Sequence, residues 1–514
     1  MTKLRMESIQ FPIVACLVPF VIRLIPEIIS PYPIGFDTIA YYIPIMLSRL
    51  ALRATLGDYL GGTILLYLPL TLAYLLLGNA LLTMKIAPAF LLGFLGMSGY
   101  LVGKDFLKWN KQRASLLSIL LCSYFVTLRI SWDLERNVLG LAFALLTLAM
   151  IEKSKTRVRS VMLPTLAALA VMTHESAAVL IVLIASAFLS SKKRYGDPRN
   201  YWPFVPAALL LTLQLLLRHD KLLAQIQTQQ ANTGLLEAFS YNLGFLIFAF
   251  WLVLPLALVG LRHEVKRPFA IWIIVCLFFG LFPNIGFPIG AAYRWTLILV
   301  VPVIVLFVQG VETALGSTKQ IWPRRLGRVV VLGFLLLSIG FSSGYLGLNS
   351  ITRNYFASAP QYSPLMPSTM VEGTVPIPDV SSIITIALWA NRTLPSSSIL
   401  ILPYQLYGWY LTTLSGNQGL IFKPGERDRN IDEIISSISP KTGPIAMYAR
   451  NVDLFVPRDE TSLTDLALDA SHLGHVYVVW WSYNSTVSNM SNLPKAFSVV
   501  YTTGNLSVFA FSIV

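Results

Sequence analysis

Charged residues are scarce in this sequence. Of its 514 residues, 12% are charged and 55% are hydrophobic, whereas a soluble globular chain averages about 25% charged residues. So little charge leaves too little polar surface to cover a water-soluble body of this size. Runs of about 18 or more apolar residues indicate bilayer spanning, and such runs fill the first two-thirds of the sequence. We therefore expect an α-helical polytopic membrane protein.

Other absences narrow the class further. The three cysteines, Cys16, Cys122 and Cys276, all lie within apolar runs, which excludes a disulfide framework and a cysteine-based zinc site. The sequence contains no glycine-rich phosphate loop, no nucleotide-binding fingerprint and no internal repeat. The apolar segment after the short basic N-terminus has no A-x-A cleavage site, so we expect it to be an uncleaved first helix.

The net charge of +14 is unevenly distributed. Residues 1–347 contain 30 Lys and Arg against 14 Asp and Glu, and residues 348–514 contain 9 against 11. Basic clusters between apolar runs are typical of cytoplasmic loops. They do not gather on one folded face, as nucleic-acid binding would require, so we expect no nucleic-acid partner. The clusters lie at 104–113, 153–159, 192–199, 262–267 and 319–328.

Twelve apolar runs alternate with these clusters. They lie near 11–29, 59–78, 85–103, 114–131, 137–151, 160–173, 176–190, 203–217, 242–261, 268–283, 295–310 and 329–347. A cytoplasmic N-terminus and an exterior C-terminus require an odd number of crossings. Because the 104–113 loop should be inside, the run at 59–78, or its junction with 85–103, is the expected exception. We therefore predict about eleven transmembrane helices.

The remaining loops mix acidic residues, His and Arg with aromatic residues, and we expect them to face outward. They lie at 129–137, 172–176, 218–234 and 282–295. The C-terminal region would then also lie outside the cell membrane. Four N-x-S/T sequons agree with this, because such sites are glycosylated only on the exported side; chance occurrence is the alternative. The sequons are at Asn391, Asn484, Asn489 and Asn505.

The composition changes at about residue 348. Proline-rich stretches indicate a linker after a transmembrane domain of residues 1–347, and residues 348–514 are predicted to form an extracytoplasmic α/β domain. The pattern predicts helices at 381–394 and 431–438, strands at 398–403, 444–449 and 475–481, and a closing β-hairpin at 497–511.

Asp37 stands out as a residue that could carry chemistry. It lies in PYPIGFDTIAYYIPIM, just after the first predicted helix and beside Tyr41 and Tyr42. A carboxylate at the outer membrane face can deprotonate an acceptor hydroxyl or hold a metal. The alternative is an Asp that only caps the helix that follows.

The stretches GFDTIAYY and RISWDLERNVLGLAFALL and the ending VVYTTGNLSVFAF, set in this architecture, resemble the GT-C glycosyltransferases. That superfamily includes dolichyl-phosphate-mannose-dependent mannosyltransferases and oligosaccharyltransferase catalytic subunits, and the ending resembles archaeal members. The resemblance implies a polyprenyl-phosphate sugar donor at the outer leaflet, with Asp37 as general base. A positive group or a metal should stabilise the leaving phosphate. The acceptor could be a lipid-linked glycan, a protein or a polymer.

Arg294 is the first candidate to bind that phosphate, and Arg129 and Arg136 compete with it. Arg294 follows GFPIGAAY at a predicted outer membrane edge, where an Arg can bind phosphate through two hydrogen bonds. Arg129 and Arg136 lie in the second predicted outer loop. For Arg294, the alternative is an interfacial side chain that extends toward water.

Four more ionisable residues, with Tyr41, are candidates for substrate binding. Asp133 and Glu135 could orient a sugar, or they could form ordinary salt bridges with the nearby arginines. His174 and Glu175 interrupt an apolar stretch, where ionisable groups are costly and tend to be functional; alternatively, they mark a tight outer turn.

A divalent cation, Mg²⁺ or Mn²⁺, could be held in the predicted outer loops. The carboxylates of Asp37, Asp133 and Glu175 are its candidate ligands. The sequence does not show whether these three groups meet.

One motif argues against protein N-glycosylation as the reaction. The stretch VVWWSYNST at 478–486 resembles the W-W-D-Y-G motif of oligosaccharyltransferases, but Ser482 stands where that motif has its acceptor-binding Asp. We therefore expect Trp480 and Trp481 to be strand core. Two other classes stay open: a transporter or structural membrane protein, and a non-GT-C polysaccharide polymerase or ligase. Transporters usually show repeats and polar groups at mid-membrane, whereas the polar residues here lie at predicted outer helix ends.

Overall fold

The computed structural model divides the chain into two compact units. One contains Met1–Ile34 and Arg49–Val371, and the other contains Gly35–Ser48 and Glu372–Val514. We call them the helical unit and the sheet unit. The structure describes residues 2–29, 31–33, 35, 37–47, 49–151, 157–190, 201–217, 235–263, 265–282, 292–316, 329, 332–333, 336–337, 377–413, 419–422, 444–449, 467–468, 471, 474–482 and 496–512.

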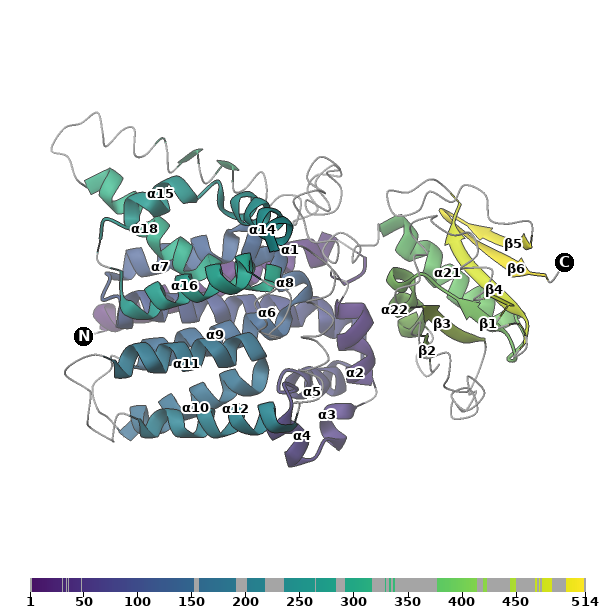
Figure 1. Ribbon diagram of the computed structural model, residues 1–514, viewed down its shortest axis with the longest axis horizontal. Coiled ribbons are helices and arrows are strands. Elements are labelled where there is room, and N and C mark those ends of the chain that lie inside the picture. Colours follow the sequence, from purple (N-terminus) through teal and green to yellow (C-terminus); the bar gives the residue numbers. More distant parts are fainter. Residues whose placement is uncertain are drawn as a thin grey trace. The chain divides into compact units, whose positions relative to one another are not determined.

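The helical unit is a stack of helices, as predicted (Figure 1). Its elements are α1 (Thr2–Ile29), α3 (Leu50–Arg53), α4 (Leu56–Gly61), α5 (Tyr67–Leu77), α6 (Ala80–Leu101), the π-helical turn η2 (Val102–Phe106), α7 (Lys111–Ser123), α8 (Phe125–Asp133), α9 (Glu135–Ile151), α10 (Arg157–Thr173), α11 (Glu175–Leu189), the short turn η4 (Trp202–Phe204), α12 (Val205–Leu217), α14 (Leu235–Phe250), α15 (Leu254–Gly260), α16 (Arg267–Leu281), α17 (Ala292–Ile298) and α18 (Val300–Gly316).

Three of the described helices are long and apolar enough to cross a membrane, namely Gln10–Ile29, Ala80–Phe106 and Tyr293–Thr313. Two bent helix pairs, α7 with α8 (58°) and α14 with α15 (86°), would raise the number to five. The eleven predicted crossings therefore stay a prediction. The run at 59–78 is not one helix, because α4 ends at Gly61 and α5 begins at Tyr67.

Small residues let the first two long helices approach closely. A Cβ added to Gly93 would lie 2.9 Å from the carbonyl oxygen of Cys16, and one added to Gly96 would meet Ala15 and Pro19. These glycines of α6 face α1, and the two helices pack along their length. Close backbone approach at small residues is how membrane helices associate where the surrounding lipid is as apolar as the side chains.

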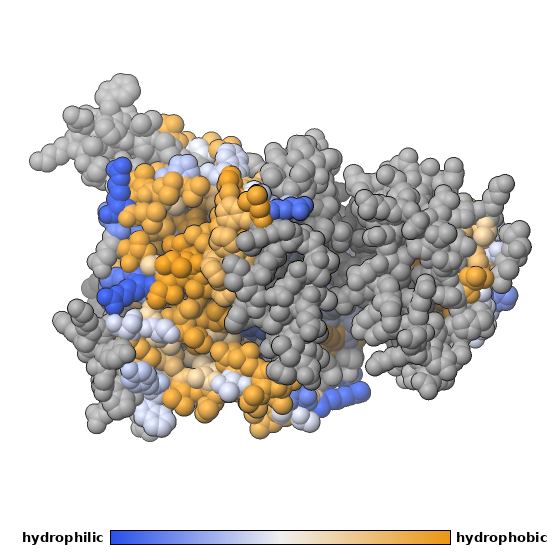
Figure 2. Space-filling model, in the orientation of Figure 1, coloured by the Kyte–Doolittle hydropathy of each residue, from blue (hydrophilic) through white to orange (hydrophobic). Residues whose placement is uncertain are grey.

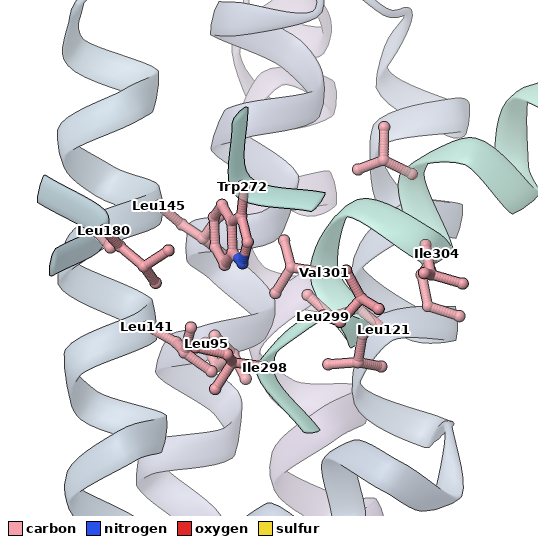
Figure 3. Packing of buried hydrophobic residues seen from close by; sticks show 14 of the residues in the cluster. Leu95, Leu121, Leu141, Leu145, Leu180, Trp272, Ile298, Leu299, Val301 and Ile304 are labelled. Carbon is pink, nitrogen blue, oxygen red and sulfur yellow. The ribbon is translucent and has the colours of Figure 1, made fainter. Parts of the chain in front are cut away.

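The core of the helical unit is apolar and continuous. Figure 3 shows the indole of Trp272, from α16, among side chains of α9, α11 and α18, including Leu145, Leu180 and Val301. Apolar side chains also gather on the surface of this unit (Figure 2), where Leu76 is 87% exposed and Ile274 66%. A water-soluble monomer rarely exposes a large continuous apolar surface, so this surface is typical of contact with lipid.

The two bends in the helix pairs meet each other. The α7–α8 bend lies at Tyr124, and the Tyr124 hydroxyl donates a hydrogen bond of 2.6 Å to the carbonyl oxygen of Ala249 in the last turn of α14. The Tyr124 ring also stacks on Phe250, and Phe125 packs edge-on against Phe248. Aromatic side chains at the α7–α8 bend therefore pack against aromatic side chains at the α14–α15 bend.

The sheet unit contains six strands in the order β2-β3-β1-β4-β6-β5 (Figure 1). Strands β1, β2, β3 and β4 are parallel, and β6 pairs antiparallel with both β4 and β5. Helix α21 packs against β5 and β6, and α22 packs against β3. The bounds are α21 (Ile377–Thr393), β1 (Ile399–Ile401), α22 (Tyr404–Thr413), β2 (Gly419–Phe422), β3 (Ile445–Ala449), β4 (Val476–Trp481), β5 (Phe497–Thr503) and β6 (Leu506–Phe511).

These elements match most of the predicted α/β pattern. The predicted strands at 398–403, 444–449 and 475–481 and the closing hairpin are present, whereas α22 and β2 were not predicted. The helix predicted at 431–438 and the predicted boundary at residue 348 lie outside the described residues.

Candidate functional site

Asp37 begins a short π-helical turn in the sheet unit. It is the N-terminal flanking residue of η1 (Thr38–Tyr42), which leads directly into α2 (Ile43–Leu47). The backbone of Asp37 is itself helical, with φ −61° and ψ −28°, and its side chain makes no capping hydrogen bond. Helix capping, the alternative for this residue, is therefore not what the carboxylate does. π-Helical turns of this kind are frequent at functional sites.

The Asp37 segment packs against α22. Both η1 and α2 contact this helix, which follows the first parallel strand of the sheet. Thr38 and Ile43 are fully buried, whereas the side chain of Tyr41 is 42% exposed. Asp37 and Tyr41 thus belong to the sheet unit, and the other residues predicted to bind the donor phosphate or the sugar belong to the helical unit.

Within the helical unit, three segments meet in a polar relay. Arg136, in the first turn of α9, donates from Nη1 to Oγ1 of Thr63 at 3.1 Å. The Thr63 hydroxyl in turn donates to Oε1 of Glu175, at the start of α11, at 3.4 Å. Thr63 is buried, while the Glu175 side chain is 32% exposed. The relay connects a guanidinium to a carboxylate that reaches the surface.

This relay joins two of the segments predicted to face outward. Residues 129–137 and 172–176 contribute Arg136 and Glu175, and Thr63 comes from the break between α4 and α5. Gln214, near the end of α12, also binds the break between α4 and α5. Its Nε2 donates to the carbonyl oxygens of Gly62 at 3.2 Å and Val171 at 3.4 Å.

His174 is the single residue between α10 and α11. Its Nδ1 accepts a hydrogen bond of 3.1 Å from the backbone N–H of Ser176 and caps α11. A nitrogen that accepts an N–H carries no proton, so the proton of the neutral ring lies on Nε2. The 3.6 Å approach of Nδ1 to Oε2 of Glu175 is therefore not a hydrogen bond. His174 thus lies in a tight turn, whereas the carboxylate of Glu175 accepts from Thr63 in the relay. Substrate binding by either residue stays a prediction.

Arg129 and Glu135 lie on either side of the break between α8 and α9. Arg129 is 5% exposed and Glu135 is 1% exposed. Charged groups buried this deeply are retained only with partners, and both have them. Arg136, by contrast, is partly exposed and is engaged in the relay. The side chain of Asp133 lies outside the described residues.

Arg294 lies in the first turn of α17, which packs against α8, α14 and α16. Its Nε is 3.5 Å from the hydroxyl of Tyr293, and its guanidinium carbon is 6.0 Å from the centre of that ring. Both contacts are at the outer limit for such interactions. The side chain is partly buried. Its role in phosphate binding stays a prediction.

Among the described residues, no three His, Cys, Asp or Glu side chains gather as a metal site would require. The divalent cation at Asp37, Asp133 and Glu175 therefore stays a prediction as well.

Two predicted sequons lie in described parts of the sheet unit. Asn391 is exposed in the last turn of α21. Asn505 is partly buried, and its Nδ2 donates to Oδ1 of the fully buried Asp379 at 2.9 Å. Asn484 and Asn489 lie outside the described residues.

The tryptophan pair is strand core, as predicted. Trp480 is 1% exposed and Trp481 is 4% exposed in β4. The indole of Trp481 donates to Oδ2 of Asp379 at 2.8 Å, so one carboxylate ties α21 to β4 and to the turn of the closing hairpin.

No protein-family model matches this sequence, and no curated protein matches it. Solved structures do match. The crystal structure of ArnT from Cupriavidus metallidurans in the apo state has a TM-score of 0.52 at 12% identity, over 99% of this chain and 98% of ArnT.

A second solved structure is that of a mutant of the arabinofuranosyltransferase AftD from Mycobacteria. It has a TM-score of 0.50 at 13% identity, over 98% of this chain but 42% of AftD. At such low identity these matches show a shared fold. The chain thus has the fold of ArnT over nearly its full length, helical and sheet units both included.

Proposed function

We propose that this protein is a GT-C glycosyltransferase. It moves a sugar from a polyprenyl-phosphate donor to an acceptor at the outer face of the membrane. The observation that carries the proposal is the fold shared with ArnT over 99% of the chain, because ArnT and AftD are GT-C glycosyltransferases. The resemblance of the sequence around Asp37 and residues 129–146 to the same superfamily supports it independently.

In this proposal Asp37 is the general base. The oxygen of the acceptor hydroxyl attacks the anomeric carbon while its proton passes to the Asp37 carboxylate. The bond between the anomeric carbon and the phosphate oxygen breaks, and polyprenyl phosphate leaves as an anion. The Asp37 side chain makes no helix-capping hydrogen bond, so the proposed role as general base does not compete with a capping role.

The leaving phosphate needs a positive partner, and Arg136 is the best-supported candidate. It is partly exposed and fixed at the start of α9 by its hydrogen bond to Thr63. A pre-organised cation costs little reorganisation when charge develops on the phosphate. Arg294 and the buried Arg129 remain further candidates for the phosphate, and Glu175, His174, Glu135, Asp133 and Tyr41 for the sugar.

The structure favours this proposal over a transporter. Broken membrane helices form ion or substrate sites in transporters when their freed backbone groups are available to the cargo. Here the carbonyl of Ala249 accepts from the Tyr124 hydroxyl, and the two described bends are packed with aromatic rings. The polar relay lies instead at helix ends, as expected for chemistry at a membrane face.

The test uses the full-length protein in lipid vesicles with a panel of polyprenyl-phosphate sugars. Wild-type protein should transfer at least one of these sugars to a lipid or glycan acceptor. Asp37→Asn should slow transfer by roughly 10²- to 10⁴-fold, since it removes the general base, without changing the thermal unfolding midpoint.

The matched control for Asp37 is Asp58→Asn. Asp58 is also an Asp near the start of a short helix, but its carboxylate is used in a capping box with Thr55. This control should leave the transfer rate near that of wild type. Transfer that survives Asp37→Asn unchanged would show that another group is the base.

A further inference from the structure

We infer that a buried ion pair in α1, formed by Arg23 and Glu27, positions the junction of α8 and α9 at residues 131–136. Through that junction it sets the place of Arg136 at the donor phosphate. The inference rests on the proposed function for its activity measurement, and a second measurement is independent of activity.

The pair is fully enclosed within an apolar helix. Arg23 and Glu27 lie one turn apart, with Nη1 of Arg23 2.6 Å from Oε1 of Glu27, and their side chains are 0% and 1% exposed. Both lie within Gln10–Ile29, a span long and apolar enough to cross a membrane. Ionisable groups at such a place are costly and tend to be functional.

Stability alone does not account for this pair. Two apolar side chains of similar size often stabilise a protein as well as a buried ion pair does, or better, because the charges lose their hydration. In addition, Nη2 of Arg23 has no hydrogen-bond partner among the described residues. A buried donor left in this way lowers stability. Some other benefit should therefore maintain the pair.

That benefit is visible in the second contact of Arg23. Nε of Arg23 donates to the carbonyl oxygen of Ser131 at 3.3 Å, across 108 positions of sequence. Ser131 lies in the last turn of α8, where carbonyl groups lack a partner within the helix. A cation at this end also complements the partial negative charge of the helix dipole. Glu27 holds the guanidinium in place for this contact.

The position of the end of α8 determines where α9 begins. At Leu134 the backbone leaves the helical region, with φ −118° and ψ 48°, and α9 begins at Glu135. Only this short break separates Ser131 from Arg136. A shift of the α8 terminus would therefore move Arg136 relative to Thr63 and break the 3.1 Å hydrogen bond of the relay.

The test compares two variants of the full-length protein in lipid nanodiscs. Arg23→Met/Glu27→Met removes both charges and leaves no unpaired one behind. Arg23→Lys keeps the charge but loses the geometry that reaches both Glu27 and Ser131. The control is Thr147→Val in α9, which removes a buried hydroxyl that donates locally, to the carbonyl oxygen of Phe143 one turn earlier.

The first measurement is amide hydrogen exchange. In the double variant, exchange of the amides of residues 131–137 should become about tenfold faster or more, since the junction of α8 and α9 loses its anchor. Exchange in the later turns of α9 and the thermal unfolding midpoint should stay near those of wild type. Unchanged exchange at 131–137 would overturn the inference, whatever the activity.

The second measurement is steady-state transfer. Because Arg136 binds the donor phosphate in the proposal, both variants should raise the KM for the donor by about tenfold or more, as loss of orientation can cost up to 10²-fold in rate. The KM for the acceptor should not change. A double variant that folds and transfers with wild-type constants would show that the pair is structural only. If wild-type protein transfers no sugar, the proposed function fails, and hydrogen exchange still decides whether the pair holds the junction of α8 and α9.

Discussion

At the scale of single residues, the buried hydroxyl of Tyr410 lowers the stability of the sheet unit. It lies in α22 with its side chain fully buried, and its hydroxyl has no hydrogen-bond partner among the described residues. An unpaired buried hydroxyl costs about 1–3 kcal/mol. Tyr410→Phe should therefore stabilise the sheet unit by about 1 kcal/mol, measured as a shift of its denaturation midpoint.

The same substitution should change the response to alkaline pH. Burial raises the pKa of the Tyr410 hydroxyl above its ordinary value, which is about 10. Above that pH the unfolded chain loses the proton while the folded chain retains it, so folding becomes less favourable as pH rises. Tyr410→Phe removes this loss. Its advantage over wild type should grow between about pH 10 and 11, and a constant advantage would contradict the assignment.

The sequence predicted some residues of the candidate site and not others, for physical reasons. Asp37, Arg136 and Glu175 could be identified because charged residues in apolar surroundings are costly. Thr63 could not, since a threonine beside two glycines gives no signal, and its role arises from the break that brings it between α9 and α11. Arg23 and Glu27 did carry a signal, as charges within the first apolar run.

At the scale of elements, the contact of α15 with α18 depends on two facing glycines. A Cβ on Gly260 would overlap the carbonyl oxygen of Leu306, and a Cβ on Gly310 would overlap that of Leu256. Backbone atoms cannot move aside as the end of a side chain can. Gly260→Ala and Gly310→Ala should each destabilise the helical unit by about 1–3 kcal/mol or more, measured as the unfolding midpoint in detergent.

The control for these glycines is Gly57→Ala. Gly57 also lies in a helix, α4, but a Cβ there would meet only Oγ1 of Thr55, at an ordinary 3.5 Å. Alanine is preferred to glycine in helices by about 1 kcal/mol, so this variant should be neutral or stabilising. Equal midpoints for Gly57→Ala and Gly260→Ala would show that α15 and α18 do not approach as closely as described.

Hydrophobic patterning predicted where helices are but not where they bend. The runs at 114–131 and 242–261 read as single spans, yet each is a bent pair of helices. The bends are stabilised by a contact between the two pairs, from Tyr124 to Ala249, and a contact between segments so distant in sequence leaves no local pattern. The strands of the sheet unit were predicted more closely, because each is a short apolar run bounded by turn residues.

At the scale of the whole molecule, the chain enters the sheet unit twice. Residues 35–48 leave the helical unit after α1, pack against α22 and return, and residues 372–514 enter at the end. The sequence alone suggested a single boundary near residue 348, because a 14-residue insertion is too short to change the local composition. The segment that carries Asp37 is thus part of the fold of the C-terminal unit.

This division makes a prediction about cooperativity. Ile43 and Met46 of α2 are 0% exposed, and large-to-small substitutions at such positions cost about 2–5 kcal/mol. If residues 35–48 fold with the sheet unit, Ile43→Ala and Met46→Ala in the full-length protein should speed amide exchange in α22 and β1. These elements lie more than 350 residues away in sequence. Amide exchange in α9 should not change. The matched control, Leu145→Ala in the core of the helical unit, should do the reverse. Faster exchange in α9 with no effect on β1 would assign the Asp37 segment to the helical unit instead.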